Sequence, residues 1–207
     1  TFDTVIANPP FSLANWGAER WVADPRARFG VPPAKNGDFA FVQHMVSSMS
    51  TGIGRVGVVM PHGALVRTGM EANIRRGLIE ADLLEAVIGL PPNLFYSTDI
   101  PTCILIFRNE KPVERKNKVL IIDGSSCFEK SVNRNTMTDS DVASLIAAYR
   151  QGTVPNGSTG INIRLVPLEE IESREFDLRL GHYMQVAAEQ SADFGSVLMA
   201  YADTRQR

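Results

Sequence analysis

Short apolar runs that alternate with segments of helical spacing constrain the fold of this chain most. Residues 2–7, 55–60 and 83–90 are rich in apolar and β-branched residues, as expected of strands. Between them, apolar residues recur at helical spacing in residues 37–49 and 70–81, which predicts two helices. Strands and helices in this order form a largely parallel sheet with both faces covered. The sequence therefore predicts an α/β fold.

The second half of the chain continues this pattern less regularly. Residues 102–107 and 119–123 are two further strand-like runs, and residues 168–173 resemble a short acidic helix. Thr138, followed three residues later by Asp141, predicts a capping box at the start of another helix. These elements extend the predicted sheet and add helical structure after it.

A chain of 207 residues is long enough to bury roughly 70% of its unfolded surface in one domain. We expect residues 1–123 to form the main part of that domain and residues 124–184 its C-terminal mixed or helical extension. Residues 185–207 form a weakly amphipathic tail that either folds alone or docks on a partner. The chain opens at Thr1, directly before a strand-like run, which suggests that an upstream part of the domain is missing.

Composition argues against several classes of protein. Lys and Arg number 21 and Asp and Glu number 23, so the formal charge is −2. A near-neutral chain is not a free-standing nucleic-acid binder driven by phosphate neutralisation, although one basic face or a basic partner remains compatible. Cys103 and Cys127 fit neither a disulfide framework nor a metal-binding pattern. Without a signal peptide or an apolar run of about 18 residues, we expect a cytoplasmic protein with no metal site and no membrane span.

Residues 52–57 match the dinucleotide fingerprint G-x-G-x-x-G, but in the wrong context. That motif binds a pyrophosphate only where it follows a strand and opens a helix. Here the predicted helix precedes the glycines and the predicted strand follows them. We therefore interpret the segment as a helix end and a tight turn.

The sequence Asn8-Pro9-Pro10-Phe11 is the strongest functional signal. It follows a predicted buried strand, at the edge of the sheet where open α/β folds bind ligands. The Asn8 side-chain oxygen and the Pro9 carbonyl oxygen can accept both hydrogens of a planar exocyclic amine, as in adenine or cytosine. Held in a loop stiffened by proline, the nitrogen becomes tetrahedral and directs its lone pair at an electrophilic methyl group. Phe11 offers a face on which a flipped base can stack.

At this motif the sequence resembles the catalytic strand and loop of the adenine-N6 DNA methyltransferases. It is also similar, block by block, to the modification subunit of type I restriction–modification systems. These blocks are residues 2–11, 37–44, 59–63, 90–96, 100–103, 119–123, 134–138 and 176–183. Because they keep their order over most of the chain, the blocks are far more specific than the motif alone. The simpler interpretation of the motif, a turn with a buried Phe11, is the alternative.

The resemblance implies the second half of a Rossmann-like S-adenosylmethionine-dependent methyltransferase sheet, with parallel strands and an antiparallel strand at residues 102–107. It also implies methyl transfer to a flipped adenine, with Asn8, Pro9, Pro10 and Phe11 as catalytic residues. In the family, the cofactor-binding segments precede this strand. This chain is therefore expected to lack most of them and to bind S-adenosylmethionine weakly or not at all on its own. The implied partners are DNA, a specificity subunit, a second modification subunit and a restriction subunit that translocates DNA.

We expect three loops to meet at the carboxyl edge of the sheet, at residues 8–36, 61–69 and 91–101. His62 lies in the second loop, either as a target-pocket residue or as an ordinary loop histidine. For Phe95 and Tyr96, in the third loop, packing under the loop is favoured over base contact. His44 lies on the apolar face of a predicted helix and is expected in or near the core.

The first of these loops mixes aromatic and basic residues, namely Trp16, Arg20, Trp21, Arg26, Arg28 and Lys35. Such a mixture suits contact with an unstacked base and with nearby phosphates. A loop that is partly disordered without DNA is equally compatible with it.

Two other functions remain open. The chain could be a non-catalytic fragment whose task is assembly with a specificity subunit. Alternatively, Asn-Pro-Pro followed by an aromatic residue also serves methylation of a glutamine side-chain amide in proteins. The later blocks and the long loop favour DNA over protein as the substrate.

Overall fold

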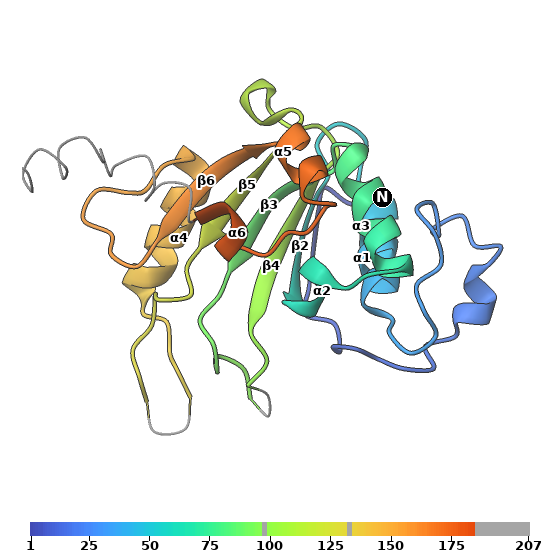
Figure 1. Ribbon diagram of the computed structural model, residues 1–207, viewed down its shortest axis with the longest axis horizontal. Helices are drawn as coiled ribbons and strands as arrows, with labels where there is room; N and C mark the ends of the chain where they lie inside the picture. The colour runs from blue at the N-terminus through green and yellow to red at the C-terminus, as the bar shows by residue number, and fades with distance from the viewer. Residues whose placement is uncertain (97–98, 132–133, 185–207) are drawn as a thin grey trace, which may run out of the picture.

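The chain folds around a six-stranded mixed sheet (Figure 1). The computed structural model describes residues 1–96, 99–131 and 134–184. The strands are β1 (Thr4–Ala7), β2 (Arg55–Pro61), β3 (Leu84–Gly89), β4 (Thr102–Arg108), β5 (Lys118–Asp123) and β6 (Asn162–Pro167). The helices are α1 (Asp38–Ser47), α2 (Gly63–Val66), α3 (Met70–Glu80), α4 (Asp139–Gln151), α5 (Leu168–Ser173) and α6 (Gly181–Met184). Two short 3-10 helices, η1 (Ala18–Trp21) and η2 (Val113–Arg115), lie in connecting segments.

The strand order is β1-β2-β4-β3-β5-β6. β1 pairs with β2 in parallel and β3 with β5 in parallel, while β4 lies between β2 and β3 and runs antiparallel to both. The predicted α/β sheet of parallel strands with an antiparallel return strand is therefore confirmed, and β6 adds a second antiparallel strand beside β5. Because β1, β2, β3 and β5 point the same way, their carboxyl ends share one edge of the sheet.

Two hydrophobic clusters cover the two faces of the sheet. On one face, residues of β2, β3 and β4 pack with α1, α3 and the segment 176–183. On the other face, Ala86, Ile88 and Leu120 pack with Leu145 of α4 and its neighbours. Side chains alternate between the faces along a strand, so β3 is buried along its whole length. Full burial of one such Leu or Ile side chain contributes about 1.5–3 kcal/mol.

β1 differs from the buried strand that the sequence predicts. It lies at the edge of the sheet and spans four residues, and its side chains are alternately exposed and half-buried. Val5 and Ala7 pack against the core, whereas Ile6 is 80% exposed. The prediction of a buried strand here is wrong, because an apolar run cannot reveal which strand ends the sheet.

Most helices begin and end close to their predicted positions. The predicted capping box of α4 is confirmed: the Asp141 backbone N–H donates to Thr138 Oγ1 at 3.1 Å, and the Thr138 N–H donates to Asp141 Oδ2 at 2.8 Å. His44 of α1 is exposed rather than in the core, because it lies at the border of the helix's apolar stripe. β6 was not predicted, because its apolar–polar alternation, at residues 161–165, is short and follows a segment rich in Gly, Pro, Asn and Ser.

In the segment 52–57, the predicted tight turn is confirmed, but the predicted helix end is wrong: α1 already ends at Ser47, and residues 55–57 belong to β2. No helix in the described part of the chain is long and apolar enough to cross a membrane. The expected amphipathic tail, residues 185–207, lies outside the described residues.

Candidate active site

The Asn8-Pro9-Pro10-Phe11 motif begins where β1 ends. Asn8 is exposed, Pro9 is buried and Phe11 is half-buried. The buried proline fixes the backbone at the point where the chain leaves the sheet, since its ring restricts φ. The asparagine side chain is therefore presented to solvent from a restrained backbone.

The three loops expected at this edge of the sheet contact one another. The Phe11 and Phe95 rings are 6.5 Å apart between centroids and lie edge to face at 81°. The His62 backbone N–H donates to the Pro101 carbonyl oxygen at 2.9 Å. Arg67, in the loop after β2, lies 3.3 Å from the Ser12 hydroxyl through its Nη2 atom. The predicted convergence of the loops is confirmed.

The loop after β3 contributes Phe95, for which the sequence favoured packing under the loop over base contact. Phe95 does pack against Phe11, and both residues are half-buried. Tyr96 is 76% exposed, with the Arg134 guanidinium 4.0 Å from its ring centroid. The expected packing of Tyr96 under the loop is therefore wrong, because a cation on a neighbouring segment covers the ring instead.

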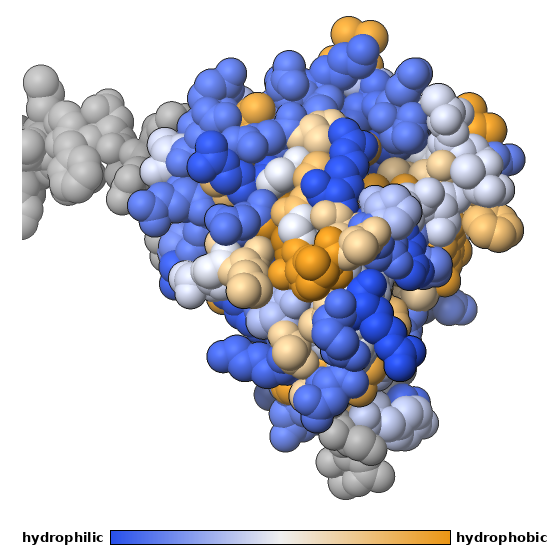
Figure 2. Space-filling model, turned by 90° about the vertical axis from the view of Figure 1, so that its right-hand side faces the viewer, coloured by the Kyte–Doolittle hydropathy of each residue, from blue (hydrophilic) through white to orange (hydrophobic). Residues whose placement is uncertain are grey.

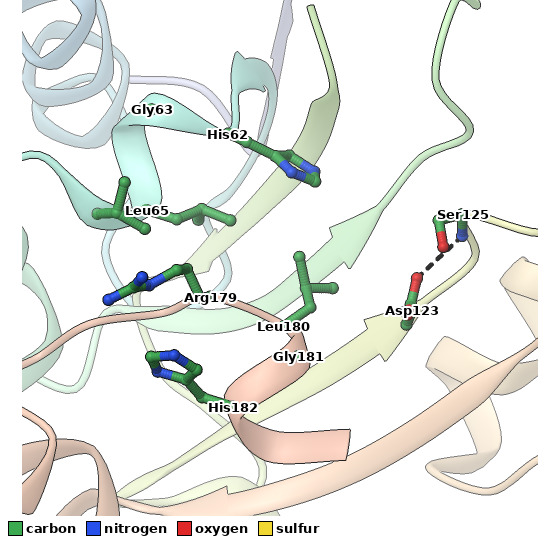
Figure 3. A pocket seen from close by; sticks show the side chains of 10 residues that line it. His62, Gly63, Leu65, Asp123, Ser125, Arg179, Leu180, Gly181 and His182 are labelled. Atoms are coloured by element: carbon green, nitrogen blue, oxygen red, sulfur yellow. Dashed lines mark hydrogen bonds between the residues drawn. The ribbon is translucent and has the colours of Figure 1, made fainter. Parts of the chain in front are cut away.

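His62 lines a cavity of 480 Å³ between α2, the end of β5 and α6 (Figure 3). Asp123, Ser125, Arg179 and His182 also line it, and the Ser125 backbone N–H donates to Asp123 Oδ1 at 3.0 Å. The sequence did not single out these four residues for the site. Only Asp123 carried a usable signal, since it ends a strand that runs parallel to β3.

The imidazole of His62 is partly desolvated in this cavity. Its Nε2 atom is buried, and no hydrogen-bond partner for it lies among the described residues. Burial lowers the pKa of His62 from its ordinary 6.5, although the Thr102 backbone and the Asp123 carboxylate act in the opposite direction. The ring is therefore uncharged at neutral pH and offers one donor and one acceptor nitrogen.

Three of the candidate DNA-binding residues in the first loop form one packed cluster. The rings of Trp16 and Trp21 lie 5.3 Å apart at 80°, and the Arg26 guanidinium is 4.9 Å from the Trp21 ring. The indole N–H of Trp16 donates to the Pro33 carbonyl at 3.0 Å. Arg26 pairs with Asp24 at 2.6 Å. These contacts hold the loop in a folded conformation. The Trp16 N–H and the Arg26 guanidinium are already paired within the loop.

The other basic residues of the loop face outward. Arg20, Arg28 and Lys35 are exposed, and Arg28 lies over the Phe29 ring at 5.0 Å. Figure 2 shows the side of the molecule that carries this loop, where hydrophilic residues surround a small apolar area. The structure thus separates a packed aromatic cluster from outward-facing cations.

The described residues do not supply a complete cofactor site. In the described part of the chain, no strand leads through a glycine-rich turn into a long helix, the arrangement that binds nucleotide-like cofactors. Nor do three or more His, Cys, Asp or Glu side chains gather as a metal site there.

Comparison with known proteins decides the family. The model of the N-6 DNA methylase family matches residues 1–192, nearly all of the 207 residues. The chain belongs to the N-6 DNA methylase family. The predicted family and fold class are therefore confirmed.

Relatives of this N-6 DNA methylase include subunits of type I restriction enzymes. The MjaIX methylase subunit of Methanocaldococcus jannaschii is 32% identical over 200 residues, which cover 91% of this chain and 36% of the relative. The HindI methylase subunit of Haemophilus influenzae is 32% identical over 192 residues, covering 91% of this chain and 43% of the relative. A type I restriction–modification methyltransferase subunit from Streptococcus thermophilus superposes with a TM-score of 0.76 and 33% identity, covering 87% of this chain and 37% of that structure. The chain spans less than half the length of these relatives.

Proposed function

We propose that this chain forms the target-base half of the active site of a site-specific adenine-N6 DNA methyltransferase of a type I restriction–modification system. One observation carries the proposal: Asn8 is exposed directly after β1 and is followed by the buried Pro9 and by Phe11, whose ring packs against Phe95. An amide acceptor beside aromatic faces suits a base that presents an amine on a flat ring.

The reaction needs an amine nitrogen whose lone pair is available. In adenine that lone pair is delocalised into the ring. When Asn8 Oδ1 and the Pro9 carbonyl accept the two amine hydrogens, the nitrogen becomes tetrahedral and its lone pair points away from both acceptors. The proline-restricted backbone that carries both acceptors supports this role, because a stiff loop needs little reorganisation at the moment of reaction. After alkylation the nitrogen carries a positive charge and releases its proton.

The methyl donor is S-adenosylmethionine, as is general for this family. Because the residues described here do not fit a complete cofactor site, we assign no residue of this chain to holding the donor. The contribution of the chain lies in binding and orienting the base.

The aromatic pair gives the flipped base a surface to stack on. Stacking of a base on an aromatic side chain contributes about 1–3 kcal/mol and tolerates any base. Phe11 and Phe95 lie edge to face, so a base that stacks on one ring meets the edge of the other. His62, in the neighbouring cavity, is proposed to contact the target nucleotide or the one beside it.

The candidate DNA contacts divide into two groups in this proposal. Arg20 and Arg28, which are exposed, contact phosphates, and Lys35 adds a third cation. Trp16, Trp21 and Arg26 shape the loop that carries them. The other proposed partners are a specificity subunit, a second modification subunit and a translocating restriction subunit. This assignment draws on the similar methylase subunits of type I restriction enzymes.

Substitution of Asn8 tests the function. In the native full-length protein, assembled with its partners, Asn8→Ala should lower the rate of N6-methyladenine formation at least about a hundredfold, because one acceptor of the amine is lost. Unfolding should be nearly unchanged, since Asn8 is exposed. The readout is mass spectrometry of nucleosides from the methylated DNA.

Asn73→Ala is the matched control, since Asn73 is an exposed asparagine of α3 that lies outside the motif. Retention of full activity by Asn8→Ala would contradict the mechanism. Methylation of a protein glutamine instead of DNA in the same assay would favour the protein methyltransferase alternative. A native complex that assembles but methylates neither acceptor would favour a role in assembly alone.

A further inference from the structure

A buried carboxylate lies under the segment that follows the motif. Asp38, the first residue of α1, is 1% exposed. Its Oδ1 atom accepts the backbone N–H of Ser12 at 2.7 Å, and Ser12 directly follows Phe11. Its Oδ2 atom accepts from Arg67 Nη1 at 2.7 Å. One side chain therefore holds two of the three loops of the site together.

These bonds are not an ordinary helix cap. A capping side chain accepts from the first N–H groups of its own helix, and α1 has no such side-chain bond. The backbone N–H of Asp38 is instead satisfied by Asn36 Oδ1 at 2.9 Å. Both carboxylate oxygens of Asp38 are thus directed at other segments of the chain.

Arg67 completes the connection from the loop after β2. Its Nη1 atom donates to Glu71 Oε1 at 2.8 Å as well as to Asp38, and its Nη2 atom lies 3.3 Å from Ser12 Oγ. The guanidinium passes over Gly63, where a Cβ atom would lie 2.7 Å from Nη2. Any larger residue at position 63 would displace Arg67.

The backbone at Ser12 shows that this arrangement constrains the loop. Its φ is 51°, in the left-handed region that residues other than glycine rarely adopt. Such a conformation persists only where its surroundings hold it, and it is frequent next to functional sites. β1 supplies little of this hold, because it is a four-residue strand at the edge of the sheet.

We propose that Asp38 and Arg67 are positioning residues that clamp Ser12 and thereby set the direction in which Asn8 and Pro9 present their acceptors. This inference rests on the proposed function. The clamp touches neither base nor cofactor and acts only through the backbone after Phe11. A displacement of about 1 Å at a reacting group is enough to lower a rate about a hundredfold.

Asp38 and Glu71 are two buried carboxylates that pair with the same Arg67 guanidinium, so substitutions at these two positions form a matched pair. Asp38 and Glu71 both accept from Arg67 Nη1, and both are buried, but only Asp38 reaches Ser12. In the native full-length complex, Asp38→Asn should lower kcat for DNA methylation about ten- to a hundredfold, with KM for DNA changed less than about twofold. Glu71→Gln should keep kcat within about twofold.

A third variant covers the case in which Asp38→Asn fails to fold. Ser12→Gly adopts a φ of 51° without strain and removes the hydroxyl near Arg67, so it should fold normally. Because it keeps the N–H that Asp38 accepts but removes the hydroxyl contact with Arg67 and the side chain that restricts φ, it should lower kcat several-fold without lowering the unfolding temperature. Full kcat in Ser12→Gly, or equal losses of kcat in Asp38→Asn and Glu71→Gln, would overturn the clamp.

The same assays separate this inference from the proposed function. If Asn8→Ala abolishes methylation while Asp38→Asn and Ser12→Gly retain it, the clamp alone is wrong. If Asn8→Ala retains methylation, the proposed function itself is wrong.

Discussion

At the scale of single residues, the environment of His62 has a measurable consequence. Burial holds the pKa of His62 below its ordinary 6.5, so the folded protein binds fewer protons than the unfolded chain in the range just below that value. The free energy of unfolding should therefore fall as the pH drops from about 7 through 6.5 towards the lowered pKa. His62→Gln should remove this part of the pH dependence.

Unfolding of the native protein and of His62→Gln by guanidinium chloride, at several pH values between about 7 and 5, measures how the free energy of unfolding of each depends on pH. His44 and His182 remain in both proteins and serve as the internal control. An unchanged slope in His62→Gln would show that the imidazole is not desolvated.

Residue identity predicted the motif but not the partners of the loop residues. Asn8 and Phe11 carry their chemistry in their own side chains, so sequence is enough to find them. Arg26 looked like a phosphate ligand, yet it pairs with Asp24 and contacts His44 Nδ1 at 3.0 Å. Such pairings depend on the path of the chain, which the composition of a loop does not encode.

At the scale of elements, the capping box of α4 offers a direct test of local stability. Thr138→Ala removes the acceptor for the Asp141 N–H and should lower the free energy of unfolding by about 1 kcal/mol. Urea unfolding monitored by circular dichroism measures the loss. Thr153→Ala, in the exposed loop after α4, is the control and should change stability by less than about 0.5 kcal/mol. Equal effects of the two substitutions would contradict the capping role.

Elements with strong local signals were predictable, and those defined by their neighbours were not. The periodic α3 and the capped α4 occur as expected, since their signals lie within the element. β6 is fixed in the sheet by six paired positions with β5, while its own signal, an apolar–polar alternation over residues 161–165, is short. The cavity at His62 escaped prediction for the same reason, because its walls come from segments far apart in the sequence.

At the scale of the whole molecule, the segment after α5 closes one face of the sheet. The Leu178 N–H donates to the Leu65 carbonyl at 3.0 Å, and Arg75 Nε donates to the Phe176 carbonyl at 2.8 Å. Leu178 and Tyr183 are buried in the same cluster as the central strands. The expectation that residues 1–184 form one domain stays a prediction, which these contacts favour.

The substitution Leu178→Ala tests whether residues 1–184 form one domain. The substitution should lower the free energy of unfolding by about 2–5 kcal/mol, with one transition and an unchanged denaturant dependence. Leu165→Ala, at a strand position that is 37% exposed, should cost clearly less. A second, separate transition in Leu178→Ala would show that the C-terminal extension folds independently.

The place of β1 in the sheet has a consequence for the behaviour of the chain in solution. Among the described residues, β1 pairs on one side, with β2, and Ile6 on this strand is exposed. An uncovered strand edge with an apolar side chain is a template for adding another strand. A strand added at this edge would therefore border the loop that begins at Asn8.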